Sequence, residues 1–131
     1  CALPILGQPW RTQEIVDEVL HTLYFNNPDG LSGNEDCGQM SAWYILNAMG
    51  FYQVCPGKPV YSIGRPLFNE ATVHLKDGKS FKVIAHNNSR DNKYVQSIVL
   101  NGHKLETPFF THQDIVDGGT LELTMGSEPL K

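Results

Sequence analysis

The sequence is poor in basic residues and contains no long apolar run. Lysine and arginine together number 10 among 131 residues, against 14 aspartates and glutamates, for a net charge of −4. Without a basic stripe, the chain is not expected to bind nucleic acid. No apolar stretch approaches the ~20 residues of a membrane-spanning helix, so no membrane span is expected. A composition that is 40% hydrophobic and 18% charged is typical of a globular domain and excludes a disordered chain.

Patterns that hold metals or form disulfide frameworks are also scarce. The three cysteines, Cys1, Cys37 and Cys55, form an odd set without Cys-x-x-Cys spacing, so neither a zinc site nor a disulfide framework is indicated. A single Cys37–Cys55 pair stays open, because spacing alone does not decide it. The five histidines lack the His-x-x-x-His spacing of a zinc-binding helix.

Before about residue 57 the apolar pattern is helical. Thr12 is a good N-cap for a helix expected over residues 13–25, which would bury a wide apolar face. A second helix is expected over residues 38–49, with Gly50 ending it. This second helix is apolar nearly all round, which is typical of a helix buried inside a larger body. It is the first indication that the chain is part of a longer protein.

The later part of the chain reads as short strands with tight turns. Strands at residues 71–75 and 81–85 flank an Asp-Gly turn, and strands at 95–100 and 103–105 flank an Asn-Gly turn. A last strand is expected over residues 120–125. Short strands joined in this way predict an antiparallel β-sandwich.

Together these patterns predict an α+β fold. Residues 1–57 are expected to contribute helices to a larger α-domain, and residues 58–131 to form a complete or nearly complete β-sandwich.

The loop before the second helix places two adjacent carboxylates, Glu35 and Asp36, beside the helix N-terminus. Three glycines, Gly30, Gly33 and Gly38, let the backbone bend tightly around them. Carboxylates in this position can act as a general base, bind a cation, or cap the helix. The residues alone leave these alternatives open, with capping the simplest. The loop lacks the alternating ligands of an EF-hand, so a self-contained calcium loop is not indicated.

Several segments resemble the C-terminal part of the family 92 glycoside hydrolases. The run from Gly33 to Tyr44, Gly-Asn-Glu-Asp-Cys-Gly-Gln-Met-Ser-Ala-Trp-Tyr, is long and highly specific. Other matching stretches extend the resemblance over nearly the whole chain, at residues 7–13, 28–32, 50–52, 61–68, 101–102, 111–112 and 118–121. Members of this family are bacterial exo-acting α-mannosidases, several times longer than this chain. They combine an N-terminal β-sandwich with a six-hairpin (α/α) barrel, and the resemblance implies that residues 1–57 are a helical hairpin piece of that barrel.

The resemblance also implies an inverting mechanism. One carboxylic acid protonates the leaving oxygen, and a carboxylate about 6.5–9.5 Å away activates water on the opposite face of the sugar. The base candidate of the family, the aspartate that closes the Gly-[Asn/Asp]-Glu-Asp motif, falls on Asp36, with Glu35 in the same pocket. The general acid is implied to lie upstream of Cys1, so this chain alone is expected to be inactive.

Three further residues are candidates for binding the substrate: Asn34, Gln39 and Trp10. Some family members have aspartate at the position of Asn34, so a second carboxylate is not implied there. Gln39 suits either a hydrogen bond to a sugar hydroxyl or the start of the helix. Trp10 suits either stacking on a pyranose ring or core packing, whereas Trp43, in the middle of the second helix, is expected in the core.

The resemblance implies a cofactor, substrates and a location. A bound calcium is expected in the complete enzyme, with ligands that are not assignable in this chain. The expected partners are mannose-containing glycans, with an α-1,2 linkage preferred, and the rest of the parent chain. The expected location is the periplasm or cell surface of a bacterium.

A different class of function also stays open for residues 60–131. A β-sandwich often carries a sugar site, which would make this segment a non-catalytic carbohydrate-binding module. No row of aromatic residues suited to an exposed sugar platform is evident in it, however. A purely structural role, in which the sandwich braces the barrel, is the third alternative.

Overall fold

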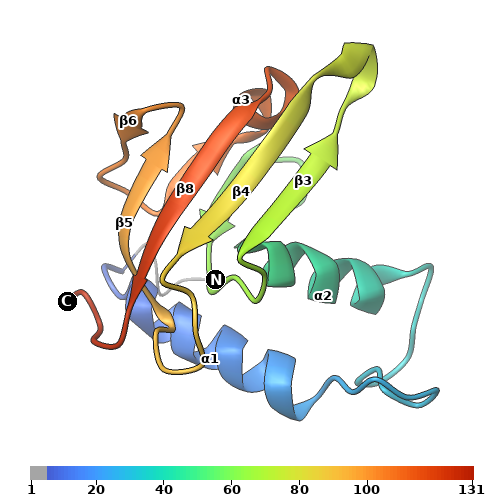
Figure 1. Cartoon of the computed structure of the whole chain (residues 1–131). Coiled ribbons are helices and arrows are strands. Elements are labelled where there is room, and N and C mark those ends of the chain that lie inside the picture. Colours follow the sequence, from blue (N-terminus) through green and yellow to red (C-terminus); the bar gives the residue numbers. More distant parts are fainter. Residues whose placement is uncertain (1–5) are drawn as a thin grey trace.

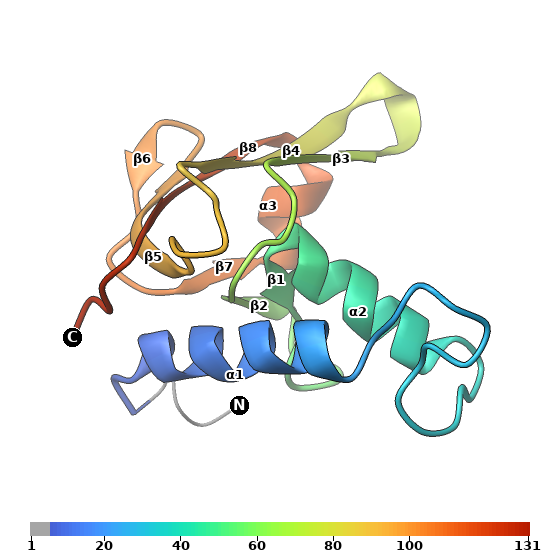
Figure 2. The same cartoon turned by 60° about the horizontal axis from the view of Figure 1, so that its bottom comes forward.

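The computed structural model describes residues 6–131 as two long helices packed beneath two β-sheets (Figure 1). Helices α1 (Pro9–Thr22) and α2 (Gln39–Met49) lie on the same side of the strands. The loop that joins them projects away from the sheets, as two views show (Figures 1 and 2). Cys1 lies outside the described residues.

Helix α1 begins earlier than the sequence analysis predicts. Pro9 occupies its first turn, where the fixed φ of proline fits a helix and its missing N–H costs no hydrogen bond. The predicted N-cap, Thr12, therefore lies inside the helix, and the helix ends at Thr22 instead of residue 25.

Helix α2 agrees with its predicted bounds to within one residue. It ends at Gly50, whose φ of 104° is a left-handed conformation that glycine adopts without strain. A Cβ at this position would also come within 3.1 Å of the Pro66 Cβ. Gly50 thus ends the helix and lets the chain pass close to Pro66, as the sequence pattern predicts for the helix end.

The strands form a sheet of five and a sheet of three. The five-stranded sheet has the order β3-β4-β8-β5-β6, with β3 at Glu70–His74, β4 at Ser80–His86, β8 at Gly119–Gly126, β5 at Tyr94–Leu100 and β6 at His103–Lys104. The three-stranded sheet has the order β1-β2-β7, with β1 at Phe51–Tyr52, β2 at Val60–Ile63 and β7 at Phe109–Thr111. Two short helices complete the fold, η1 at Lys76–Gly78 and α3 at His112–Val116.

The α+β class, both predicted hairpins and the last strand are confirmed. One ladder differs from the antiparallel expectation, because β4 and β8 pair in parallel. The reason lies in the connection between them. The chain leaves β4, forms the β5–β6 hairpin, crosses to the other sheet as β7, and returns through α3 to insert β8 between β4 and β5.

The hydrophobic core lies between the two sheets. Three aromatic rings form its centre: Phe51 contacts Phe81 and Phe110 edge-on at centroid distances of 6.4 and 5.4 Å, and Phe81 stacks on Phe110 at 5.8 Å. Strand β8 alternates between buried and partly exposed residues and points Leu121 and Leu123 into this core. Both leucines are completely buried.

Helix α1 attaches to the β-strands through polar residues. The Val95 N–H donates to Gln13 Oε1 at 3.1 Å, the Tyr94 hydroxyl donates to Glu14 at 2.7 Å, and Asp17 pairs with Arg65 at 2.9 Å. Gln13, Asp17 and Arg65 are all buried. The apolar face predicted for this helix is only partly buried, and its Ile15 is 41% exposed. The prediction was wrong here because these hydrogen bonds and this ion pair allow polar side chains to be buried.

The two predicted segments share a sheet. Strand β1 precedes residue 57, yet it pairs with β2, which follows it, in the register Phe51 to Ile63. The division of the chain at residue 57 stays a prediction.

Candidate functional site

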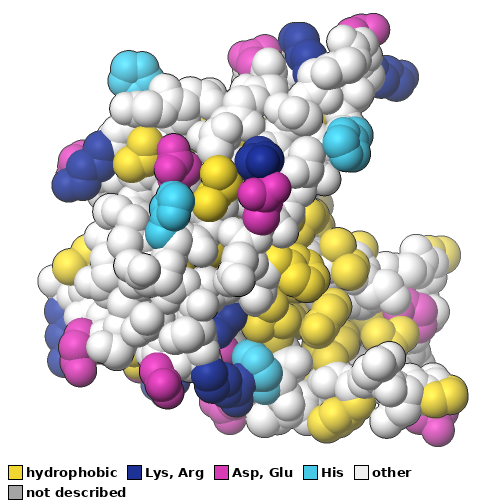
Figure 3. All heavy atoms as spheres, in the orientation of Figure 1, with side chains coloured by type: hydrophobic (Ala, Val, Ile, Leu, Met, Phe, Trp, Pro, Cys, Tyr) yellow, Lys and Arg dark blue, Asp and Glu magenta, His cyan; other side chains and the backbone are white. Residues whose placement is uncertain are grey.

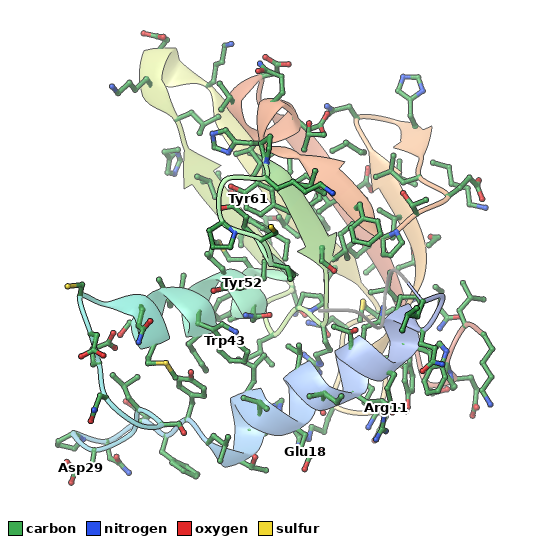
Figure 4. All side chains as sticks on the ribbon, turned by 180° about the vertical axis from the view of Figure 1, so that it is seen from behind. Arg11, Glu18, Asp29, Trp43, Tyr52 and Tyr61 are labelled. Atoms are coloured by element: carbon green, nitrogen blue, oxygen red, sulfur yellow. The ribbon has the colours of Figure 1, made fainter. Side chains whose placement is uncertain are left out.

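The loop between α1 and α2, residues 23–38, carries the paired carboxylates. Figure 4 shows Asp29 at its outer end and Trp43 between α2 and α1. Trp43 stacks on Tyr24 at a centroid distance of 5.6 Å, and the ring of Tyr44 lies 5.0 Å from that of Tyr24. These rings join the start of the loop to α2. Trp43 packs against other aromatic rings, but it is half-buried and lies outside the core between the sheets, where it was expected.

Just before α2 the chain turns through two consecutive left-handed residues. Cys37 has a φ of 55° and Gly38 a φ of 79°. The Gln39 N–H donates to the Asp36 carbonyl oxygen at 3.1 Å and closes the turn. Asp36 is therefore the last residue before this turn. Its backbone carbonyl is hydrogen-bonded to Gln39, the first residue of α2.

The Asp36 side chain is exposed. Within residues 6–131 no donor forms a hydrogen bond with its carboxylate. Both of its oxygens are therefore accessible to a ligand or to water, as a general base requires.

The Glu35 carboxylate, in contrast, is fully engaged with α2. Its Oε1 accepts from the Met40 N–H at 3.0 Å, and its Oε2 accepts from the Ser41 N–H at 3.0 Å and from the Ser41 hydroxyl at 2.5 Å. These contacts, the Ser41 hydroxyl first, lower the pKa of Glu35 from its usual value because they stabilise the charged form. The capping alternative of the sequence analysis thus describes the contacts of Glu35.

A hollow of 380 Å³ adjoins this loop. Its volume falls in the range of small-molecule sites, roughly 300–1,000 Å³. It is lined by aromatic, aliphatic and polar groups of the loop and α2: Tyr24, Phe25, Asn26, Gly30, Leu31, Ser41, Tyr44 and Ile45. Ser41 connects the hollow to Glu35. Ser41 was not predicted from the sequence; its place as the third residue of a helix that follows an acidic loop is the signal that could have indicated it.

The structure places the remaining candidates in two regions. Asn34 and Gln39 flank the carboxylates and are both exposed. Trp10 lies at the opposite end of α1, roughly 18 Å along the helix axis from Thr22 at 1.5 Å per residue. Its ring is 5.8 Å from the Lys131 Nζ, and it lines a separate hollow formed with β5 and the 104–108 segment. The structure thus brings Asn34 and Gln39 to the carboxylates but not Trp10.

The described part of the chain offers no ready metal centre. No group of three or more histidine, cysteine, aspartate or glutamate side chains comes together among residues 6–131. Cys37 and Cys55 are both exposed and free, so they form no disulfide with each other. No helix in the described residues has the length and hydrophobicity to cross a membrane.

Comparisons with known proteins show what the whole chain is similar to. The model of the glycosyl hydrolase family 92 catalytic domain matches residues 4–127. A family GH92 α-mannosidase from Bacteroides thetaiotaomicron, solved with mannoimidazole, has 41% sequence identity and a TM-score of 0.91, over 97% of this chain and 17% of its own. A family GH92 inverting mannosidase from the same organism has 46% identity and a TM-score of 0.84, over 92% of this chain and 16% of its own.

A curated relative is more distant. An uncharacterized secreted glycosidase from Arthroderma benhamiae is 30% identical over 125 residues, which are 93% of this chain and 16% of that protein. The fold and these matches place the chain among the glycoside hydrolases. It belongs to glycosyl hydrolase family 92, and the resemblance noted in the sequence is confirmed. The chain spans about a sixth of the length of the relatives it matches.

Proposed function

We propose that this chain is the C-terminal part of an inverting, exo-acting α-mannosidase that removes terminal α-linked mannose from glycans. Family membership supports the hydrolase class, and the two Bacteroides relatives described above are mannosidases. The observation that carries the proposal is the position of Asp36, which is exposed and, among residues 6–131, accepts no hydrogen bond at its carboxylate, just before the start of α2.

In this proposal Asp36 is the general base. Its carboxylate accepts a proton from the water that attacks the anomeric carbon, while a carboxylic acid elsewhere in the parent enzyme protonates the leaving oxygen. A base must be held in place while keeping a free lone pair for the proton. The turn at Cys37 and Gly38 holds the backbone of Asp36, and its exposed carboxylate keeps the lone pairs.

Substitution of Asp36 in the complete enzyme tests this role. Asp36→Asn keeps the size of the side chain but cannot take the proton, so mannose release from α-1,2-mannobiose is expected to fall at least ~100-fold, the low end for general base catalysis. Asp29→Asn, which changes another exposed carboxylate of the same loop, is the matched control and is expected to retain activity. Near-full activity of Asp36→Asn would reject Asp36 as the base.

The proposal also makes the rest of the parent chain a partner of this segment. Apolar side chains of α2 and of the neighbouring loop are exposed, among them Ile45 at 50% and Phe25 at 58%. Figure 3 shows hydrophobic side chains gathered in the concave area beside α2. Apolar area of this kind marks an interaction surface, which the remaining helices of a barrel would cover. The isolated chain, without the acid, is expected to release no mannose, and measurable release by it would contradict the proposal.

Calcium in the complete enzyme is part of the same proposal. Residues 6–131 bring together no group of three or more histidine, cysteine, aspartate or glutamate side chains, and we assign no calcium ligand within them. Chelation of the complete enzyme is expected to abolish mannose release, and added calcium to restore it. Activity that survives chelation would remove calcium from the proposal.

For location, we propose secretion to the periplasm or cell surface of a bacterium. The name of the Arthroderma relative, a secreted glycosidase, agrees with export. Fractionation of cells that make the parent enzyme tests this, and a cytosolic enzyme would contradict it.

For the β-strands alone, a bracing role is favoured over sugar binding. The aromatic rings of Phe51, Phe81 and Phe110 are buried between the sheets, where they cannot form a platform for a sugar. Titration of mannose into the chain is therefore expected to leave the NMR signals of the strands unchanged. Shifts in those signals would revive the carbohydrate-binding alternative.

A further inference from the structure

The side chain of Glu35 bridges the turn that follows Asp36. Its hydrogen bonds to the start of α2 close a ring made of residues 35–41. This side chain reaches forward five and six residues, to the Met40 and Ser41 N–H groups at 3.0 Å each. These are the second and third residues of α2, whose N–H groups have no partner inside the helix. The Ser41 hydroxyl adds a third donor at 2.5 Å.

Asp36 lies inside this ring. The ring encloses the left-handed pair Cys37 and Gly38 and the hydrogen bond from the Gln39 N–H to the Asp36 carbonyl oxygen. A left-handed conformation is unfavourable for a residue with a Cβ, as Cys37 has, and it persists only where the surroundings impose it. The contacts of Glu35 with α2 are the only side-chain hydrogen bonds among the described residues that span this turn.

The two carboxylates of the loop therefore differ in what they can do. Three donors occupy the oxygens of Glu35, and they lower its pKa, which makes it a weaker proton acceptor. No donor among residues 6–131 occupies Asp36. The two neighbouring carboxylates thus differ: that of Glu35 binds the start of α2 and fixes the loop, whereas that of Asp36 is exposed.

We propose that Glu35, held by Ser41, is a positioning residue that sets the orientation of the Asp36 carboxylate. The inference rests on the proposed function, in which Asp36 is the base. Glu35 then contributes to the reaction through Asp36 and does not itself accept the proton.

Kinetics of the complete enzyme on α-1,2-mannobiose test this inference. Glu35→Ala is expected to lower kcat by about 10- to 100-fold, the effect of a small misplacement of a catalytic group, with KM changed less than about threefold. Ser41→Ala, which removes one of three donors, is expected to have a smaller effect in the same direction. Ser41→Thr, which restores the hydroxyl, is expected to recover most of the loss. Asp29→Asn is the matched control.

A double variant separates positioning from an independent role. If Glu35 acts through Asp36, adding Glu35→Ala to Asp36→Asn is expected to lower kcat by less than about twofold, because interacting residues are not additive. A further loss of tenfold or more in the double variant would overturn the inference. Should Glu35→Ala not fold, Glu35→Gln, which keeps one acceptor oxygen, carries the same comparison.

The outcomes distinguish this inference from the proposed function. If Asp36→Asn keeps its activity, the proposed base is wrong. If Asp36→Asn loses activity while Glu35→Ala and Ser41→Ala do not, only the positioning role is wrong. If Glu35→Ala loses much more activity than Asp36→Asn, Glu35 is itself the base, and the positioning role is overturned.

Discussion

Arg65 and Asp17 form the most deeply buried ion pair among the described residues, with side chains 4% and 9% exposed and a separation of 2.9 Å. Arg65 also donates to the carbonyl oxygens of Pro66 and Ser89. One guanidinium group therefore joins α1 to the segment after β2 and to the segment after β4. Removing its partner would leave a buried charge without compensation.

Asp17→Ala is therefore expected to destabilise the chain by about 3 kcal/mol, the low end for breaking a buried pair, because Arg65 keeps its two carbonyl contacts. Urea denaturation measures this. Glu18→Ala, at the exposed neighbouring position of the same helix, is the control and is expected to change stability by less than about 0.5 kcal/mol. Equal effects of the two substitutions would show that the ion pair contributes nothing.

At the level of single residues, the sequence indicated the loop that carries both carboxylates, but not which of the two contacts the helix. The Gly-Asn-Glu-Asp motif places Glu35 and Asp36 together, and nothing in their order says which one turns toward the helix. The answer depends on the left-handed turn at Cys37 and Gly38, which brings the Glu35 carboxylate over the start of α2. A non-glycine residue in that conformation is uncommon, and sequence patterns do not predict it.

At the scale of elements, the contact of α1 with β5 contains a hydrogen bond that responds to pH. The Tyr94 hydroxyl and then Arg11 lower the pKa of Glu14 from its usual 4.5, and the same bond raises the pKa of Tyr94 from its usual 10.0. A carboxyl group whose pKa is lower in the folded than in the unfolded state stabilises the folded state at a pH above its unfolded pKa. This stabilisation is lost as the pH falls through the folded pKa.

The stability of the chain is thus expected to decline as pH falls below about 4.5. Glu14→Gln is expected to remove part of this decline, and Tyr94→Phe is expected to do the same. Urea denaturation between pH 3 and 7 measures both, with Glu18→Gln as a control on the exposed side of α1. An unchanged slope in both variants would show that this bond does not contribute to the pH dependence.

The helices and strands that could be predicted from the sequence are those set by local signals. The hairpins were predictable because their Asp-Gly and Asn-Gly turns are local signals, and the end of α2 was predictable because of Gly50. The start of α1 was not, because two N-terminal signals compete and Pro9 prevails over Thr12. Its buried face was not predictable either, since Gln13 and Asp17 are buried by partners more than 40 positions away in the sequence, Val95 and Arg65.

For the molecule as a whole, the apolar surface of α2 is exposed in the isolated chain and is proposed to be covered in the parent enzyme. Ile45 is half exposed here, so Ile45→Ser is expected to change the stability of the isolated chain by less than about 0.5 kcal/mol. In the complete enzyme, where the proposal covers this surface, the same change is expected to cost about 2 kcal/mol or more.

Thermal unfolding of both proteins checks this expectation. Val116→Ser, at a 42% exposed position on α3 away from that surface, is the matched control and is expected to have a small effect in both. An equally small effect of Ile45→Ser in the complete enzyme would show that the parent chain leaves α2 uncovered.

The place of β8 in the five-stranded sheet constrains the order in which this protein can fold during translation. Strands β4 and β5 leave the ribosome before β8, yet they do not pair with each other, because β8 lies between them. Until residues 119–126 emerge, one edge of each strand stays open to other chains, which is a hazard for aggregation. The five-stranded sheet therefore closes only after β8 has emerged, and the core that Leu121 and Leu123 of this strand complete cannot form before then.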